Sequence, residues 1–163
     1  MLNLTLERIE RHIRSLPVEH VYVLGADNEI LFHSTDDQHS RVLIPGEIAV
    51  HLPGTLVTHN HPGGRSLSPT DVLVARRVRV REMRVVTRTH RYSVTPPDHD
   101  WNSTASEDFS AVVKREQGLI LAKLDHQIAR GQLTRSMLDL SFHHRLCERL
   151  AECGLLHYSA EKW

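Results

Sequence analysis

The sequence predicts an α/β fold, with a mixed sheet flanked by helices over residues 1–97 and a helical C-terminal extension over residues 98–163. Short runs of β-branched and other apolar residues alternate with helical periodicity in the first part, which is typical of a sheet covered by helices. A Thr-Pro-Pro-Asp stretch at residues 95–98 is a linker candidate, and beyond about residue 107 strand signals give way to helical spacing. With 163 residues the chain is long enough for one domain with a core and an appendage.

The first third of the chain predicts a helix followed by strands. Residues 4–13 repeat apolar side chains at helical intervals and stop before Pro17, as an amphipathic helix does. Residues 20–24 and 29–33 flank a Gly-Ala-Asp-Asn stretch and form a predicted hairpin. Pro-Gly pairs then separate a third short strand, a short helix and a buried strand, predicted at residues 41–44, 47–52 and 55–58.

The next segment begins with two histidines and ends in a capped helix. His59 and His61 follow the buried strand directly, and a Gly-rich loop at residues 62–65 comes after them. Ser68 as N-cap, proline at the first helical position and Asp71 at the third predict a helix over residues 69–80. Two further strands, at residues 83–87 and 92–94, complete the α/β part.

Charge and hydropathy narrow the classes of function. Lys plus Arg and Asp plus Glu are both 20, so the net charge is zero and favours neither a nucleic-acid binder nor a membrane-surface protein. The beginning of the chain lacks the order of a signal peptide, and the longest apolar runs are too short to cross a bilayer. We therefore expect a cytoplasmic protein without a membrane partner.

The two histidines and Asp71 together predict a metal site. His59 and His61 can point at one ion where the chain leaves a strand, because a loop start relaxes the alternation of side chains. The Gly-rich turn lets the start of the next helix face the strand end, which brings in Asp71 as a third ligand. Two histidines, one carboxylate and an open fourth position are typical of catalytic zinc. Alternatively, Asp71 only caps its helix and the histidines are polar loop residues.

The same residues carry a resemblance to a known family. Thr58-His59-Asn60-His61-Pro62-Gly63-Gly64, followed by Ser68-Pro69-Thr70-Asp71, resembles the signature of JAMM (MPN-plus) zinc metallopeptidases, and is nearest to the bacterial RadC-type and phage or toxin-associated branches. The resemblance implies a cytidine-deaminase-like MPN/JAB fold, Zn²⁺ as cofactor and a polypeptide or isopeptide-linked substrate. Nine residues separate His61 from Asp71, where the family pattern usually has ten. This shorter loop bears on the substrate class more than on metal binding.

The resemblance also implies roles for two more residues. The family needs a glutamate on an early strand as general base and acid, and Glu19, 40 residues before His59, stands where that glutamate is expected. Glu29 and Glu47 are the alternatives. Ser68 corresponds to the serine that donates a hydrogen bond to the developing oxyanion, although it can equally be only a helix cap.

A second class of function stays open beside the zinc-dependent peptidase or isopeptidase. The chain could be a non-catalytic interaction module of the same fold, associated with phage particles, toxins or DNA. Seven arginines between residues 76 and 91 form either a basic patch or a solvated helix face continued onto an outer strand. Because the whole chain is neutral, we expect weak or no nucleic-acid binding. The helical extension could guide substrate, hold a partner or pair two protomers as a homodimer.

Overall fold

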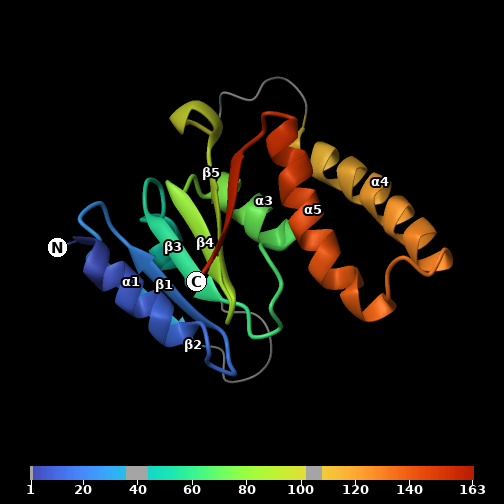
Figure 1. Ribbon diagram of the computed structural model, residues 1–163. Coiled ribbons are helices and arrows are strands. Elements are labelled where there is room, and N and C mark those ends of the chain that lie inside the picture. Colours follow the sequence, from blue (N-terminus) through green and yellow to red (C-terminus); the bar gives the residue numbers. More distant parts are fainter. Residues whose placement is uncertain (1, 36–43, 102–107) are drawn as a thin grey trace.

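The computed structural model describes residues 2–35, 44–101 and 108–163, and a mixed six-stranded sheet lies at its centre (Figure 1). The strands are arranged in the order β2-β1-β3-β4-β5-β6. In this described part, β3 and β4 pair in parallel and the other neighbouring strands pair antiparallel. The strand bounds are β1 His20–Leu24, β2 Ile30–Thr35, β3 Leu56–Asn60, β4 Glu82–Val86, β5 His90–Thr95 and β6 His157–Lys162.

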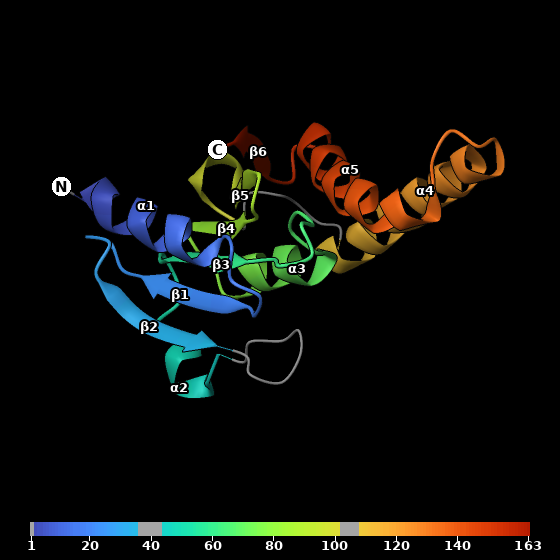
Figure 2. The ribbon, with the colours of Figure 1, turned by 60° about the horizontal axis from the view of Figure 1, so that its bottom comes forward.

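Helices cover both faces of the sheet and make a three-layer arrangement (Figures 1 and 2). Helix α1 packs on one face, where Leu6 meets Leu24 and Leu56. Helices α3, α4 and α5 pack on the other face over a larger apolar cluster that includes Val57 and Val85. The helix bounds are α1 Leu2–Ile13, α2 Gly46–Ala49, α3 Pro69–Arg77, α4 Phe109–Ala129 and α5 Leu138–Glu152, with 3-10 turns η1 Pro97–His99 and η2 Arg135–Met137.

The predicted α/β class is confirmed, and most elements of the first part lie where the sequence predicts them. The first helix, the hairpin of β1 with β2, and strands β4 and β5 are present. Helix α3 ends at Arg77, earlier than predicted, because Val78 leaves helical geometry and Arg79 takes a positive φ of 55°. Helix α2, at Gly46–Ala49, is also shorter than the helix predicted at residues 47–52. The strand predicted at 41–44 falls mainly on residues outside the described ranges.

The C-terminal extension is not wholly helical. Helices α4 and α5 are present, and α4 continues through Gly118, but residues 157–162 form strand β6, which pairs with β5. The prediction of an all-helical tail is wrong at this strand. Its sequence, His-Tyr-Ser-Ala-Glu-Lys, carries no run of large apolar residues because β6 lies at the exposed edge of the sheet. The large apolar cluster also contains side chains from both sides of residue 97.

A buried carboxylate on α1 joins the first helix to the middle of the sheet. Glu10 is fully buried and accepts hydrogen bonds from Thr58 Oγ1 at 3.2 Å, Arg91 Nε at 2.7 Å and Arg84 Nη1 at 3.4 Å. Arg91 also lies over the ring of Trp163, 4.6 Å from its centre. The interpretation of the arginines as a solvated helix face continued onto an outer strand is therefore wrong at Arg84 and Arg91, and β4 and β5 are interior strands of the sheet.

None of the helices in the described ranges combines the length and apolar character that crossing a bilayer requires.

Candidate metal centre

His59 and His61 project from the same face of the sheet at the end of β3. The strand continues through Asn60, and the His61 amide still donates to the Val86 carbonyl at 3.0 Å. Residues two apart on a strand point to the same face, so strand alternation itself brings the two rings together. Their centres are 4.8 Å apart. The prediction that the histidines meet because a loop begins at His59 is thus wrong in its reason, although the two side chains do meet.

Asp71 reaches the histidines because a tight turn and a helix cap fix its position. The amide of Gly64, at φ 77°, donates to the His61 carbonyl and closes the turn. Ser68 then caps α3 with a complete capping box, in which the Ser68 amide donates to Asp71 Oδ2 at 2.6 Å and the Asp71 amide donates to Ser68 Oγ at 3.1 Å. Asp71 Oδ1 lies 3.4 Å from His59 Nε2, and Asp71 Oδ2 lies 3.7 Å from His61 Nε2.

These separations fit one small ion. Ligand atoms bound tetrahedrally to zinc at about 2.0–2.1 Å lie roughly 3.4 Å from one another. The distance from Asp71 Oδ1 to His59 Nε2 matches that spacing, and the distance from the other oxygen, Oδ2, to His61 Nε2 is slightly longer. The His59 side chain is only 5% exposed and that of Asp71 19% exposed, so the set is shielded from water on most sides without being closed.

His61 is oriented by the backbone that follows it. Its Nδ1 lies 3.0 Å from the Arg65 carbonyl oxygen and 3.1 Å from that of Ser66. Carbonyl oxygens only accept hydrogen bonds, so Nδ1 carries the proton and Nε2 presents its lone pair toward Asp71. Metal-binding histidines are usually held in this way, because a carbonyl on the far nitrogen fixes both tautomer and ring orientation.

Glu19 joins the same cluster from the start of β1. One ligand atom from each of Glu19, His59 and His61 lies within 4.8 Å of the others, and this set could hold a metal ion. Two overlapping groups therefore share the histidines. The group with Glu19 has the spacing of a metal site, whereas Asp71, the predicted third ligand, lies beside both histidines but is not part of that set. Among the described residues, the alternative acids Glu29 and Glu47 do not take part in such a cluster. Glu29 instead accepts a hydrogen bond from the Asp27 amide in the hairpin turn.

Asn60, between the two histidines, holds the segment that carries Glu19. Its side chain points to the opposite face of β3 and is fully buried. Its Oδ1 accepts from the His20 amide at 2.7 Å, and its Nδ2 donates to the Val18 carbonyl at 3.0 Å. Glu19 lies between these two anchored residues. The sequence predicts no role for Asn60, and its signal is the asparagine itself, an amide that can both accept and donate, between the two histidines.

The charges of the metal-free site are strongly coupled. Burial opposes protonation of His59, but the carboxylate of Asp71, with a smaller contribution from Glu19, raises the pKa of His59 above its ordinary value. Burial and then the charge of His59 lower the pKa of His61 to about 4. Although burial works against ionisation of Asp71, the neighbouring histidines hold the pKa of that carboxyl well below its usual range. Above pH 4 and below the ordinary histidine pKa of 6.5, the site therefore contains an ionised Asp71, a mainly neutral His61 and a mainly protonated, positively charged His59.

Zinc binding should consequently release about one proton per ion at pH 6, because the metal must displace the proton on His59 whereas His61 is already neutral. The apparent affinity should rise with pH until His59 titrates, above its ordinary pKa of 6.5. Calorimetry at pH 6 in two buffers of different protonation enthalpy measures the release. Binding without proton release at that pH would contradict the assigned charges.

Ser68 lies at the start of α3, next to Asp71 in the capping box, and its Oγ is already the acceptor of the helix cap. The hydroxyl proton is still able to donate, since a hydroxyl accepts and donates at the same time. The expected assistance to an oxyanion therefore stays a prediction, whereas the capping role is observed directly.

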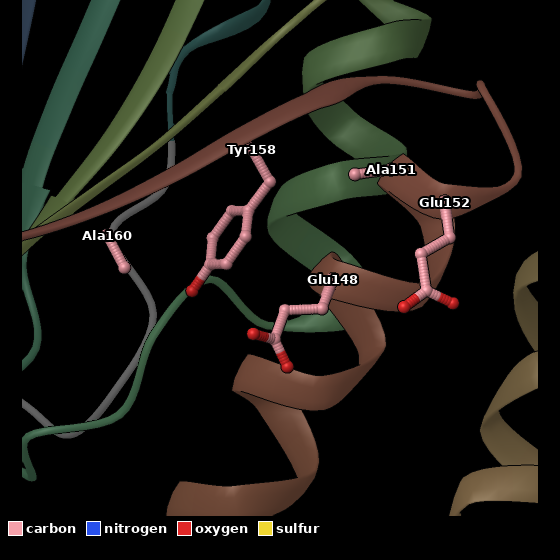
Figure 3. Close-up of a pocket in the computed structure, with 5 residues that line it drawn as sticks. All are labelled: Glu148, Ala151, Glu152, Tyr158 and Ala160. Carbon is pink, nitrogen blue, oxygen red and sulfur yellow. The ribbon is translucent and has the colours of Figure 1, made fainter.

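A surface depression of about 430 Å³ lies apart from this cluster, between α5 and β6 (Figure 3). Figure 3 shows Glu148 on α5 and Tyr158 on β6 facing it, with Ala151, Glu152 and Ala160 around them. Glu19, His59, His61 and Asp71 do not line it.

Comparisons of the chain with known protein families, with curated protein sequences and with solved structures give no match. Functional inference therefore depends on the residues of the site and their geometry.

Proposed function

We propose that the protein is a zinc-dependent hydrolase of the JAMM type, which cuts an amide bond in a polypeptide or isopeptide-linked substrate. The observation that carries this proposal is the meeting of two carboxylates, from Glu19 and Asp71, at one pair of histidines. One carboxylate is enough to complete a three-ligand site, which leaves the other for proton transfer. The order of strand, histidine pair, turn and capped helix supports assignment to the MPN/JAB fold.

Asp71 is the better candidate for the third ligand. Its Oδ1 lies 3.4 Å from His59 Nε2, which matches tetrahedral spacing, and the capping box holds the carboxylate in place through the other oxygen. Oδ2 accepts from the Ser68 amide, so Oδ1 is the oxygen left to bind the ion. Glu19 lies beside the same histidines, with a carboxylate oxygen within 4.8 Å of a nitrogen of each, so it can act on a water beside the metal.

In this proposal His59, His61 and Asp71 hold zinc, and the zinc would polarise the scissile carbonyl and make a coordinated water acidic. Glu19 would take a proton from that water and pass it to the departing amine, so one carboxylate serves as base and then as acid. The Ser68 hydroxyl would donate to the oxygen that gains negative charge. The Asn60 amide would keep the Glu19 segment in place during both proton transfers.

The alternative function is that of an interaction module, a protein of the same fold that binds a partner and catalyses no reaction. Two of the arginines that could have formed a nucleic-acid patch instead bind the buried carboxylate of Glu10. A third, Arg76, stacks over Phe109 with its guanidinium carbon 4.4 Å from the ring centre. Because these three arginines already have partners within the chain, residues 76–91 are a weaker candidate for a DNA-binding surface. The hydrolase is therefore the better-supported proposal.

Glu19→Gln separates catalysis from metal binding. The amide keeps the size of the side chain but cannot accept a proton, so cleavage should fall by at least about 100-fold, the lower end of what general acid–base catalysis contributes. Zinc content should stay at the parental level. The assay is mass spectrometry of zinc-loaded protein incubated with a panel of peptides and lysine-linked isopeptides.

Glu47→Gln is the matched control, because Glu47 is an exposed glutamate on α2 and was an alternative base. It should cleave like the parent protein. Activity that survives Glu19→Gln but not Glu47→Gln would move the base to Glu47. A zinc-loaded parent protein that cleaves no member of the panel would favour the interaction module.

A further inference from the structure

One face of α5 packs against the loop that follows the histidine pair. Near the start of the helix, Asp139 pairs with Arg65 at 3.5 Å between Oδ2 and Nη1. Two turns further on, Cys147 Sγ lies 3.7 Å from the Leu67 carbonyl oxygen. Positions four apart lie above one another on a helix, so residue 143 lies on this same stripe, midway between the two contacts. His143 therefore faces the backbone between residues 65 and 67.

That stretch of backbone is the one that orients a metal ligand. The carbonyls of Arg65 and Ser66 both accept from His61 Nδ1, at 3.0 and 3.1 Å. Any displacement of these carbonyls would rotate the His61 ring and move Nε2 away from Asp71. The position of α5 and the orientation of His61 are thus connected through two peptide groups.

The surroundings of His143 at the loop are polar. The Ser66 backbone acts on it as a hydrogen-bond acceptor, and His143 Nδ1 is itself a buried polar atom. Burial lowers the pKa of His143, and the Ser66 backbone, as a hydrogen-bond acceptor, opposes that shift together with the charge of Asp71. A histidine at this position therefore lies against the loop backbone that orients His61.

We infer that His143 is a positioning residue of the metal centre, which supports from α5 the Arg65 and Ser66 carbonyls that orient His61. The C-terminal extension is then a part of the metal site and more than an appendage. This inference rests on the proposed metal site, and it concerns metal affinity and ligand geometry, so it can be tested without a substrate.

The test is titration of the metal-free protein with Co²⁺, followed by visible absorption, which reports the geometry of the bound ion. His143→Ala should raise the Co²⁺ dissociation constant by about 10-fold or more, the range for loss of an outer partner of a metal-binding histidine. Its absorption bands should also change in position or intensity. His143→Gln keeps a hydrogen-bonding group and should recover most of the affinity.

His144→Ala is the matched control on the same helix. His144 has its own partners on α5 and β6, with Nδ1 2.7 Å from Tyr158 Oη and Nε2 3.4 Å from Glu148. Its removal should leave the affinity and spectrum for Co²⁺ at parental values. The melting temperature of each metal-free variant shows how much of any change in Co²⁺ affinity comes from a loss of folding stability.

Parental affinity and an unchanged spectrum in His143→Ala would overturn the inference and leave the metal site intact. The inference would also fail if His144→Ala weakened Co²⁺ binding as much as His143→Ala, because the effect would then belong to α5 as a whole. A parent protein that binds no Co²⁺ or Zn²⁺ would overturn the proposed function itself, and this inference with it.

Discussion

Asp71→Asn is expected to weaken Zn²⁺ binding by more than about 100-fold, beyond the 10–100-fold range for loss of an outer-shell partner, because it removes the only charged oxygen of the proposed ligand set. The asparagine side-chain oxygen can still accept from the Ser68 amide, and its backbone amide can still donate to Ser68 Oγ, so the cap of α3 should survive. Competition with a chromophoric chelator measures the dissociation constant, and thermal unfolding of metal-free protein checks the fold.

Asp108→Asn is the matched control, since Asp108 also caps a helix, accepting from the Ser110 amide at the start of α4. It should bind zinc as the parent does. The pair Asp71→Asn and Glu19→Gln then decides between the two overlapping carboxylate sets. If Asp71→Asn kept its affinity while Glu19→Gln lost it, Glu19 would be the third ligand and the roles would have to be exchanged.

Glu10→Gln should lower the free energy of unfolding by about 2–3 kcal/mol. Removal of one partner from a buried ion pair typically costs about 3–5 kcal/mol, because the other charge is left uncompensated. The expected loss is smaller here, since Arg84 and Arg91 are 20% and 25% exposed and water can screen part of their charge. Urea unfolding of the metal-free protein gives the value without a contribution from bound metal.

Glu7→Gln provides the comparison on the same helix. Glu7 pairs with Arg11 at 2.6 Å, but both side chains are exposed, so its replacement should cost no more than about 0.5 kcal/mol. Equal losses in the two variants would contradict the view that the Glu10 cluster fastens α1 to the sheet.

The metal ligands could be predicted from the sequence because they lie close together in it. A strand, a tight turn and a capped helix are local structures, and they connect His59, His61 and Asp71 within thirteen residues. Their ability to bind a metal ion then follows from their residue types, because imidazole nitrogens and carboxylate oxygens are zinc ligands. The reason given for the histidines was nevertheless wrong, because β3 runs through Asn60 and places His59 and His61 on one face by alternation.

The parts that could not be predicted depend on contacts between distant segments. Asn60 binds backbone some 40 residues earlier, Glu10 meets Arg84 and Arg91 across the sheet, and α5 reaches the loop after His61. Strand β6 could not be predicted because an edge strand that is exposed to water needs no alternation of apolar residues. Propensity and local spacing carry no information about such partners, which are determined by how the layers pack.

The central claim is that His59, His61 and Asp71 hold one zinc ion in an open site. It is tested most directly by X-ray absorption at the zinc edge on the zinc-loaded parent protein, with the zinc content per chain determined on the same sample. The account predicts one zinc per chain, surrounded only by nitrogen and oxygen ligands at about 2.0–2.1 Å, with the scattering pattern of two imidazoles. Absence of bound zinc, or a sulfur ligand at about 2.3 Å from one of the two cysteines, would contradict it.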